Sequence, residues 1–491
     1  MLRHVLLALP GLLALPAESS AAAPPATDWR AAAATDLAAM HDLLKANSPA
    51  PWVERDSGHF RGWLESGYVS ARAKLPRVHD ARGYAFLLRD YAVGFRDSHI
   101  FTAPTPAAGV DLNQPVAWPG FSVGLRGQDY RVVYRDPAET VGPAVGARLV
   151  ACDGHPVADM VRARDRFDGN LQLESSRFFA ARFLLTDRGD PFVARPRTCV
   201  FETAGRKQTW TLAWRPADAA ALKPAMAAAS GIVERRLDVA PWGDRGWWIS
   251  LPFMDDAHDW TGFYQAVDAH LSAIREAGTV VIDLRGNGGG SSRYAEKLAR
   301  TMWGEGVVDA HEPDLGPTLW RATRTNRDFW AKLVAGVEGD PHHVTDELGE
   351  LKSILSDYDK ALAAGQPTFL RAGDSPVRPP SPPSPMKGRV ILLTDQACTS
   401  ACLDLMDIFT SLPGTVQAGT VTSADTIFME LTRIDALPSG FSSLGFGHKA
   451  WVARPRSSNQ PYRPATAWTW TGDPMDEAGL RAWLAGRLDA R

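Results

Sequence analysis

The sequence predicts a multi-domain α/β protein in which an N-terminal helical domain precedes strand-rich and α/β parts. Apolar residues recur at helical spacing in residues 29–44 and 83–95, and short alternating strands follow. Two apolar strands, 280–284 and 390–393, each run through a turn into an apolar-periodic helix. Strand, turn and helix in succession are typical of α/β domains. The chain is too long for one core, so we expect two or three domains.

Residues 1–22 resemble an export signal. Arg3 and His4 precede an apolar run, Val5–Leu15, and small residues then offer a cleavage site. The run is too short to cross a bilayer, and no later stretch approaches the necessary length. We therefore expect an exported protein, periplasmic or extracellular, with no membrane span.

The first domain, residues 24–115, is expected to be helical and to carry Ser98-His99 close to its end. A strand-rich domain, residues 116–216, follows, with Gly and Pro between its short strands, a mixed insertion inside it and a turn at Ala204-Gly205. Its strands are expected at 121–125, 130–134, 147–152, 197–200 and 208–214. The α/β domain is assigned to residues 235–491. Its helical, charged insertion, residues 312–386, ends in an exposed proline-rich strip.

Within the α/β domain, alternation and helical periodicity place each element. Strands are expected at 247–251, 280–284, 390–393, 416–419, 428–434 and 448–453. Helices are expected at 262–276, from the glycine turn to 302, at 401–409 and at 476–488.

Composition excludes several classes of function. The net charge is −3 and no basic block occurs, so nucleic acid has no electrostatic footprint on this chain. No His or Cys spacing matches a zinc site, and we expect no metal and no cofactor. Four cysteines in an oxidising compartment suggest two disulfides: Cys152, Cys199, Cys398 and Cys402. Cys398 and Cys402 bracket Ser400, and either a bridge that stiffens this turn or two small buried side chains fit the spacing.

Ser400 lies where an apolar strand turns into a helix. Backbone N–H groups are unpaired there and the helix dipole is positive, which favours a nucleophile and the oxyanion beside it. Taken alone, Thr399 or Ser400 as a simple N-cap is the commoner arrangement. The catalytic interpretation therefore needs partners.

Those partners occur in a recognisable order. Asp97-Ser98-His99, a strand-rich unit, the segment 283–290 and then Thr399-Ser400-Ala401 resemble the S41 serine peptidases, which include the tail-specific and tricorn-core groups. Residues 283–290 match that family's Asp-x-Arg-x-Asn-x-Gly-Gly pattern in full. The resemblance covers about residues 30–475 apart from the insertion. It implies a crotonase-like ββα core and a PDZ-like domain whose substrate-binding loop contains Gly120 and Phe121.

The resemblance also implies roles. Ser400 would be the nucleophile, and the N–H groups of Ala401 and Gly289, or Gly288, would form the oxyanion hole. The lysine of the tail-specific branch falls on Asp425, and a carboxylate cannot replace a neutral amine. The tricorn branch instead uses a Ser-His pair, which matches Ser98-His99 and makes His99 the general base.

One departure from the family stays open. The glutamate that orients the family's His network falls on Ser458, so a Ser or Asn relay serves, another carboxylate has moved in, or activity is low. His448 is a weaker alternative base. We expect an exported serine endopeptidase that acts on peptides or unfolded proteins. A peptide-binding pseudo-peptidase and a hydrolase of non-peptide acyl groups are the alternatives.

Overall fold

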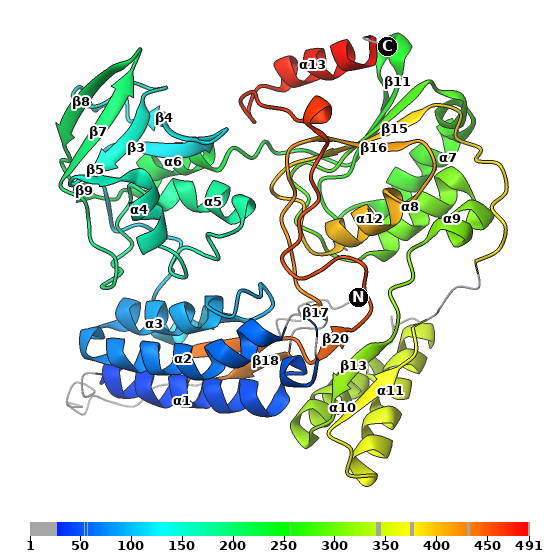
Figure 1. The fold of residues 1–491 in the computed structure, drawn as a ribbon, viewed down its shortest axis with the longest axis horizontal. Coiled ribbons are helices and arrows are strands. Elements are labelled where there is room, and N and C mark those ends of the chain that lie inside the picture. The colour runs from blue at the N-terminus through cyan, green and yellow to red at the C-terminus, as the bar shows by residue number, and fades with distance from the viewer. Residues whose placement is uncertain are drawn as a thin grey trace, which may run out of the picture.

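The computed structural model describes residues 27–53, 55, 57–255, 257–339, 345–373, 378–429 and 433–489. The predicted export signal lies outside these residues. The fold is mixed α/β with several parts: N-terminal helices, a strand-rich unit, a sheet flanked by helices and a helical insertion (Figure 1). No helix of the described residues combines the length and apolarity that crossing a membrane requires.

The N-terminal part consists of three helices and a small sheet from the other end of the chain. The helices are α1 (Trp29–Asn47), α2 (Gly58–Lys74) and α3 (Ala81–Val93), and Asp28 and Asp80 cap α1 and α3. The sheet has the order β1 (Phe101–Pro104), β19 (Ser442–Phe446), β18 (Arg433–Ala436). Leu444 and Phe446 are buried among the helices, so residues from beyond 430 complete this unit.

The strand-rich unit is an antiparallel sheet with helices beside it. Its strands follow the order β3-β4-β5-β7-β8 and agree closely with the prediction. Ala204 and Gly205, both at positive φ, form the predicted turn between β7 and β8. The disulfide Cys152–Cys199 joins β5 to β7. The unit comprises β2 (Ala117–Trp118), β3 (Phe121–Arg126), β4 (Asp129–Arg135), β5 (Arg148–Cys152), β6 (His155–Pro156), α4 (Val157–Ala163), α5 (Glu174–Ala180), β7 (Thr198–Thr203), β8 (Arg206–Thr211), β9 (Arg215–Pro216) and α6 (Ala219–Ser230).

The central sheet carries the site. Its order is β10-β11-β12-β15-β16, parallel except for β10 at one edge. Val280 and Ile282 of β12 pack under α7, α8 and α12, whereas Val281 faces the opposite layer with Leu480 and Leu484 of α13. A strand buried on both faces is expected in a parallel sheet. The elements are β10 (Asp238–Pro241), β11 (Gly246–Ser250), α7 (Trp260–Glu276), β12 (Thr279–Asp283), α8 (Arg293–Trp303), α9 (Glu305–His311), β15 (Arg389–Thr394), α12 (Ala401–Phe409), β16 (Thr415–Gly419) and α13 (Glu477–Asp489).

The insertion forms its own layer. β13 (Thr318–Arg321) pairs with β14 (Thr368–Arg371) and with β20 (Lys449–Trp451), which pairs with β17 (Phe428–Met429). Helices α10 (Arg324–Glu338) and α11 (Thr345–Ala363) pack on Trp320. The single strand predicted for 428–434 is wrong, because β17 and β18 belong to different sheets.

Candidate active site

Ser400 has an unusual backbone conformation at the junction of β15 and α12. Its φ of 56° and ψ of −128° are rare for a residue with a side chain, and its side chain makes no capping hydrogen bond. Such a conformation costs on the order of 1–3 kcal/mol and clusters at functional sites. A residue that served only as an N-cap would accept an N–H of the first turn. The cap interpretation therefore has no support in the geometry.

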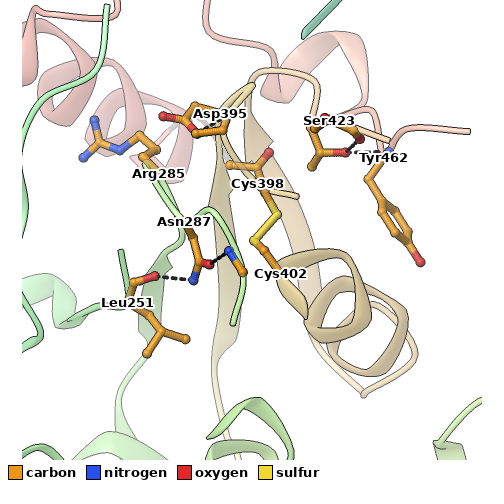
Figure 2. The surroundings of a disulfide bond; sticks show 12 residues. Leu251, Arg285, Asn287, Asp395, Cys398, Cys402, Ser423 and Tyr462 are labelled. Carbon is orange, nitrogen blue, oxygen red and sulfur yellow. Dashed lines mark hydrogen bonds between the residues drawn. A yellow bond between two sulfur atoms is a disulfide. The ribbon is translucent and has the colours of Figure 1, made fainter. Parts of the chain in front are cut away.

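The turn is fixed from both sides. Cys398 and Cys402 form a disulfide with their Cα atoms 5.3 Å apart (Figure 2). Of the two alternatives that the sequence left open, the bridge is therefore confirmed. The N–H of Thr399 donates to the backbone oxygen of Asn287 at 3.2 Å, and the Asn287 side chain donates to the Leu251 oxygen at 2.7 Å. The turn is therefore tied to the glycine segment that follows β12.

Gly289 has to be a glycine because it touches the turn at Ser400 directly. A Cβ on Gly289 would lie 2.8 Å from the Ser400 Cβ and 3.0 Å from the Ala401 nitrogen, and the residue has a φ of +92°. A Cβ on Gly290 would lie 2.0 Å from the Met254 oxygen. Both glycines of the motif therefore permit close backbone contact.

The N–H groups near Ser400 are not equivalent. The Gly289 N–H, one of the two predicted oxyanion donors, already donates to the Asn287 side-chain oxygen at 2.8 Å. Within the described parts of the chain, no hydrogen bond occupies the N–H of Gly288 or of Ala401. Gly288 is exposed and precedes Gly289, so its N–H is the alternative donor that the sequence also indicated.

A buried ion pair holds the start of the glycine segment. Arg285 donates to both oxygens of Asp283, at 2.8 and 2.6 Å, and its third nitrogen lies 3.0 Å from Glu477 of α13. Asp395 accepts the N–H groups of Gly286 and Ala397. Burial raises the pKa of Asp395, and these two donors oppose the rise. The motif residues thus fix the loop that contacts the turn at Ser400.

The predicted base lies in a tight turn after α3. The backbone N–H of His99 donates to Oδ1 of the Asp97 carboxylate at 2.9 Å. The ring nitrogen Nδ1 of His99 lies 3.4 Å from the same oxygen. Asp97 is buried, the His99 side chain is 17% exposed and Ser98 is exposed. Among the described residues, no hydrogen bond joins the Ser400 hydroxyl to the His99 ring, and no contact assigns a role to Ser98.

A short segment, residues 423–426, makes contacts with both turns. At one end the Ser423 N–H donates to the Cys398 oxygen at 3.0 Å. At the other end the Thr426 hydroxyl donates to Asp97 at 2.9 Å. Three residue steps span at most about 11 Å when fully extended. Cys398 and Asp97, which lie two residues before Ser400 and His99, are therefore both bonded to one short bridging segment.

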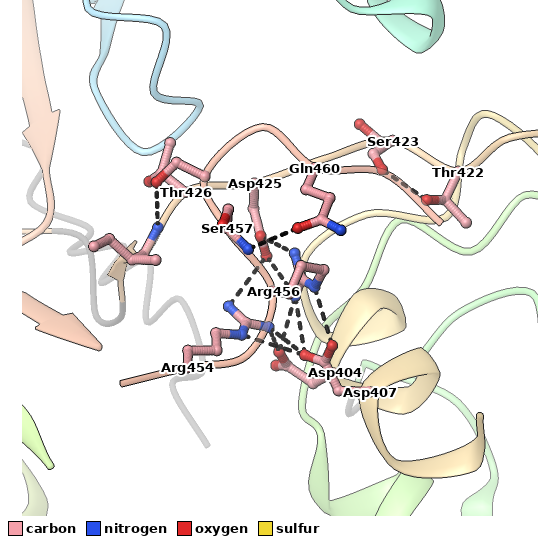
Figure 3. A network of polar contacts seen from close by, with 12 residues as sticks. Asp404, Asp407, Thr422, Ser423, Asp425, Thr426, Arg454, Arg456, Ser457 and Gln460 are labelled. Atoms are coloured by element: carbon pink, nitrogen blue, oxygen red, sulfur yellow. Dashed lines mark hydrogen bonds and ion pairs between the residues drawn. The ribbon is translucent and has the colours of Figure 1, made fainter. Parts of the chain in front are cut away.

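An arginine–carboxylate cluster anchors this segment to helix α12, which begins directly after Ser400. Asp425, at the position of the family's lysine, is buried and bonded to Arg456. Arg454 and Arg456 both bond Asp407 of α12, and Arg454 also bonds Asp404 at 2.6 Å (Figure 3). Burial favours a raised pKa for Asp407, but the hydrogen bonds and charges of the two arginines outweigh it and hold that pKa low. Sequence reasoning missed this cluster; the Arg-x-Arg and Asp-x-x-Asp spacings were its signal.

Ser458 contacts the residue that directly follows the bridging segment. Its hydroxyl accepts the Ile427 N–H at 3.1 Å, and the Asn459 side chain donates to the Arg96 oxygen at 3.0 Å. Ser458 and Asn459 line a cavity of about 300 Å³ together with Asp97 and Thr426. The predicted relay residue is thus brought to the surroundings of the base.

Two other predicted residues are buried in packed interiors. His448 accepts a hydrogen bond from the Trp330 indole at 2.8 Å, and burial first, then the nearby Lys449 and Arg433, lower its pKa to about 3. This ring is a neutral core residue, which argues against the alternative base. Phe121 packs edge-to-face with Phe201 inside the strand-rich unit.

Helix α6 covers β3, the strand that follows Gly120 in the predicted substrate-binding loop. Ser122 and Arg126 of β3 donate to backbone oxygens of α6 at 3.0 and 2.8 Å. A Cβ on Gly124 would lie 3.1 Å from the Ala229 oxygen. A peptide strand does not fit between β3 and α6 in this state, so substrate capture at Gly120 and Phe121 stays a prediction that requires α6 to move.

Comparison with known proteins adds the fold. No protein-family model and no curated protein matches the sequence. The crystal structure of mature CPAF has a TM-score of 0.61 at 14% identity and covers 94% of this chain and 96% of its own. Its complex with lactacystin gives 0.62 and 14%, covering 94% and 98%. The photosystem II D1 C-terminal processing protease is less similar, with a TM-score of 0.36 at 13% identity over 93% and 97%. The chain therefore has a mixed α/β multi-domain fold like that of CPAF.

Proposed function

We propose that this protein is an exported serine endopeptidase of the S41 type, with Ser400 as nucleophile and His99 as general base. The observation that carries the proposal is the Ser400 backbone, strained at a strand-to-helix turn and pressed against Gly289. A nucleophile held on such a turn presents its hydroxyl to the substrate beside unpaired N–H groups. The CPAF-like fold and the full glycine motif support the same assignment.

The reaction that we expect from these assignments has two stages, acylation of Ser400 and hydrolysis of the acyl-enzyme. His99 takes the Ser400 proton as the hydroxyl oxygen attacks the peptide carbonyl carbon. The oxyanion that forms accepts hydrogen bonds from the backbone N–H groups of Ala401 and Gly288. His99 then gives its proton to the leaving amine. A water molecule, activated by the same ring, hydrolyses the acyl-enzyme and regenerates Ser400. Gly289 supplies the close backbone contact and, through Asn287, the orientation of the loop that carries Gly288.

The ring and the hydroxyl have to meet when substrate binds. The bridging segment limits how far they start apart, because it bonds to Cys398 and to Asp97. Hydrogen bonds of catalytic groups often tighten only in the substrate complex. The substrates we propose are extended peptides or unfolded proteins, which reach the site between the strand-rich unit and the central sheet.

A serine-directed fluorophosphonate probe tests the proposal. The wild-type protein should be labelled, and Ser400→Ala should not be. Ser423→Ala is the matched control: it removes a nearby hydroxyl but keeps the N–H that binds Cys398. His99→Ala should slow labelling and peptide cleavage about 100-fold or more. Equal labelling of wild type and Ser400→Ala would contradict the assignment, and no labelling of either would favour the pseudo-peptidase.

A further inference from the structure

We propose that Asp97 is the positioning carboxylate for His99 and does the work that a distant glutamate performs in the family. This inference rests on the proposed function, since it assigns a residue to the same site. It answers the question left by Ser458, whose hydroxyl stands where the family has a carboxylate.

The geometry around Asp97 carries the inference. One carboxylate oxygen, Oδ1, accepts the His99 N–H and the Thr426 hydroxyl, both at 2.9 Å. The same oxygen lies 3.4 Å from the His99 ring nitrogen Nδ1. The Asp97 side chain is only 4% exposed. Two donors from different segments therefore fix a buried negative charge beside one particular atom of the ring.

The position of that charge selects the tautomer. A carboxylate next to Nδ1 favours a proton on Nδ1, which leaves the lone pair of Nε2 to accept the Ser400 proton. When the ring becomes an imidazolium, the same carboxylate stabilises it. These two effects are what a third member of a serine peptidase triad supplies.

The other polar groups nearby serve this role less well. The Ser458 hydroxyl carries no charge and accepts the Ile427 N–H. Asp425, just before Thr426, is bonded to Arg456 and is close to Arg454. Thr426 directly follows Asp425 in the chain. The arginine cluster that holds Asp425 therefore also helps to position the Thr426 hydroxyl that donates to Asp97.

A purely structural role for Asp97 is the competing explanation. An aspartate that accepts the N–H two residues later forms an Asx-turn, which many loops use. Among the described residues, Arg96 and His59 line the same cavity as Asp97, and Asp425, which is paired with Arg456, directly precedes Thr426. Asp97 has an ion-pair contact with the His99 ring, with 3.4 Å between its Oδ1 and the ring nitrogen Nδ1.

The Asp97→Asn variant separates the two explanations. Asparagine keeps an oxygen for the His99 N–H and the Thr426 hydroxyl, so the turn survives, but the charge is lost. We expect kcat to fall about 100-fold or more with KM nearly unchanged. We also expect the acidic limb of the kcat/KM profile to move down by about one pH unit, because loss of a neighbouring negative charge lowers the pKa of an imidazole. Asp97→Glu should recover part of kcat and return the acidic limb towards its wild-type position.

The outcomes are distinct. A wild-type kcat and an unmoved acidic limb in Asp97→Asn would overturn the role of Asp97. The proposed function would still stand in that case, provided that His99→Ala is inactive. Full activity of His99→Ala would remove the proposed base itself. If Asp97→Asn does not fold, nitrogen NMR of the wild-type protein decides: the neutral His99 ring should carry its proton on Nδ1, and a proton on Nε2 would overturn the proposal.

Discussion

Replacing Gly289 with alanine should disable the nucleophile turn far more than it destabilises the protein. The new Cβ would lie 2.8 Å from the Ser400 Cβ, 2.8 Å from the Thr399 oxygen and 3.0 Å from the Ala401 nitrogen. These are backbone and Cβ atoms, which cannot move aside as the end of a flexible side chain does. The turn itself must shift.

The cost has two parts. An alanine at a φ of +92° loses about 1–2 kcal/mol from left-handed backbone strain. Forcing the Cβ into the turn adds about 1–3 kcal/mol, the usual range for overpacking. Displacement of Ser400 by a fraction of an ångström relative to the oxyanion donors should lower kcat by about 100-fold or more.

Gly286→Ala is the matched control. Gly286 has a φ of +82°, close to that of Gly289, but a Cβ there meets nothing within 4 Å. It should therefore show the backbone cost without the steric one. Urea unfolding gives the two free energies, and fluorophosphonate labelling rates give the activity. Equal labelling rates for Gly289→Ala and Gly286→Ala would refute the contact between Gly289 and the nucleophile turn as a determinant of catalysis.

The two disulfides should separate stability from activity. Loop-closure entropy predicts a loss of about 4 kcal/mol without Cys152–Cys199 and about 2 kcal/mol without Cys398–Cys402, because the bridged residues are 47 and 4 positions apart. Only serine substitution of the second pair should slow probe labelling; an equal loss of labelling from the first pair would show that the bridge beside Ser400 is not special. For His448, whose pKa burial lowers to about 3, the unfolded chain takes up a proton below about pH 6.5 and the folded protein does not. Its stabilising contribution is thus complete above that pH and declines as the pH falls towards 3, by up to about 1.4 kcal/mol per pH unit. The variant His448→Phe should show a smaller acid slope in the unfolding free energy and unchanged labelling, and a slope equal to wild type would contradict the buried neutral ring.

Local patterns predicted the central sheet well because its strands and helices carry their own periodicity. β12 and β15 read as continuous apolar runs, and α12 has a clear apolar stripe. The strands of the strand-rich unit were predicted equally well, including the turn at Ala204 and Gly205. Glycine spacing and a serine at a strand-to-helix turn then pointed to Ser400, the nucleophile that we propose.

Long-range pairing was not legible in the same way. β18 and β19 pack with the N-terminal helices, although more than 300 residues lie between these strands and those helices. Nothing in the sequence of the two strands indicates that the helices are their partner. The bridging segment, with Asp425 held by Arg456, is likewise a tertiary arrangement. The resemblance predicted no lysine base, because Asp425 falls at that position, but the sequence could not show that Asp97 lies beside the His99 ring.

A crystal structure of the wild-type protein with a peptidyl phosphonate bound covalently to Ser400 would measure the central claim. The proposed mechanism predicts that a His99 ring nitrogen lies within about 3 Å of the Ser400 oxygen or of the leaving-group position. It also predicts that the phosphonyl oxygen accepts the Ala401 N–H. A His99 ring that stays far from the adduct, with another base in contact with Ser400, would contradict the account.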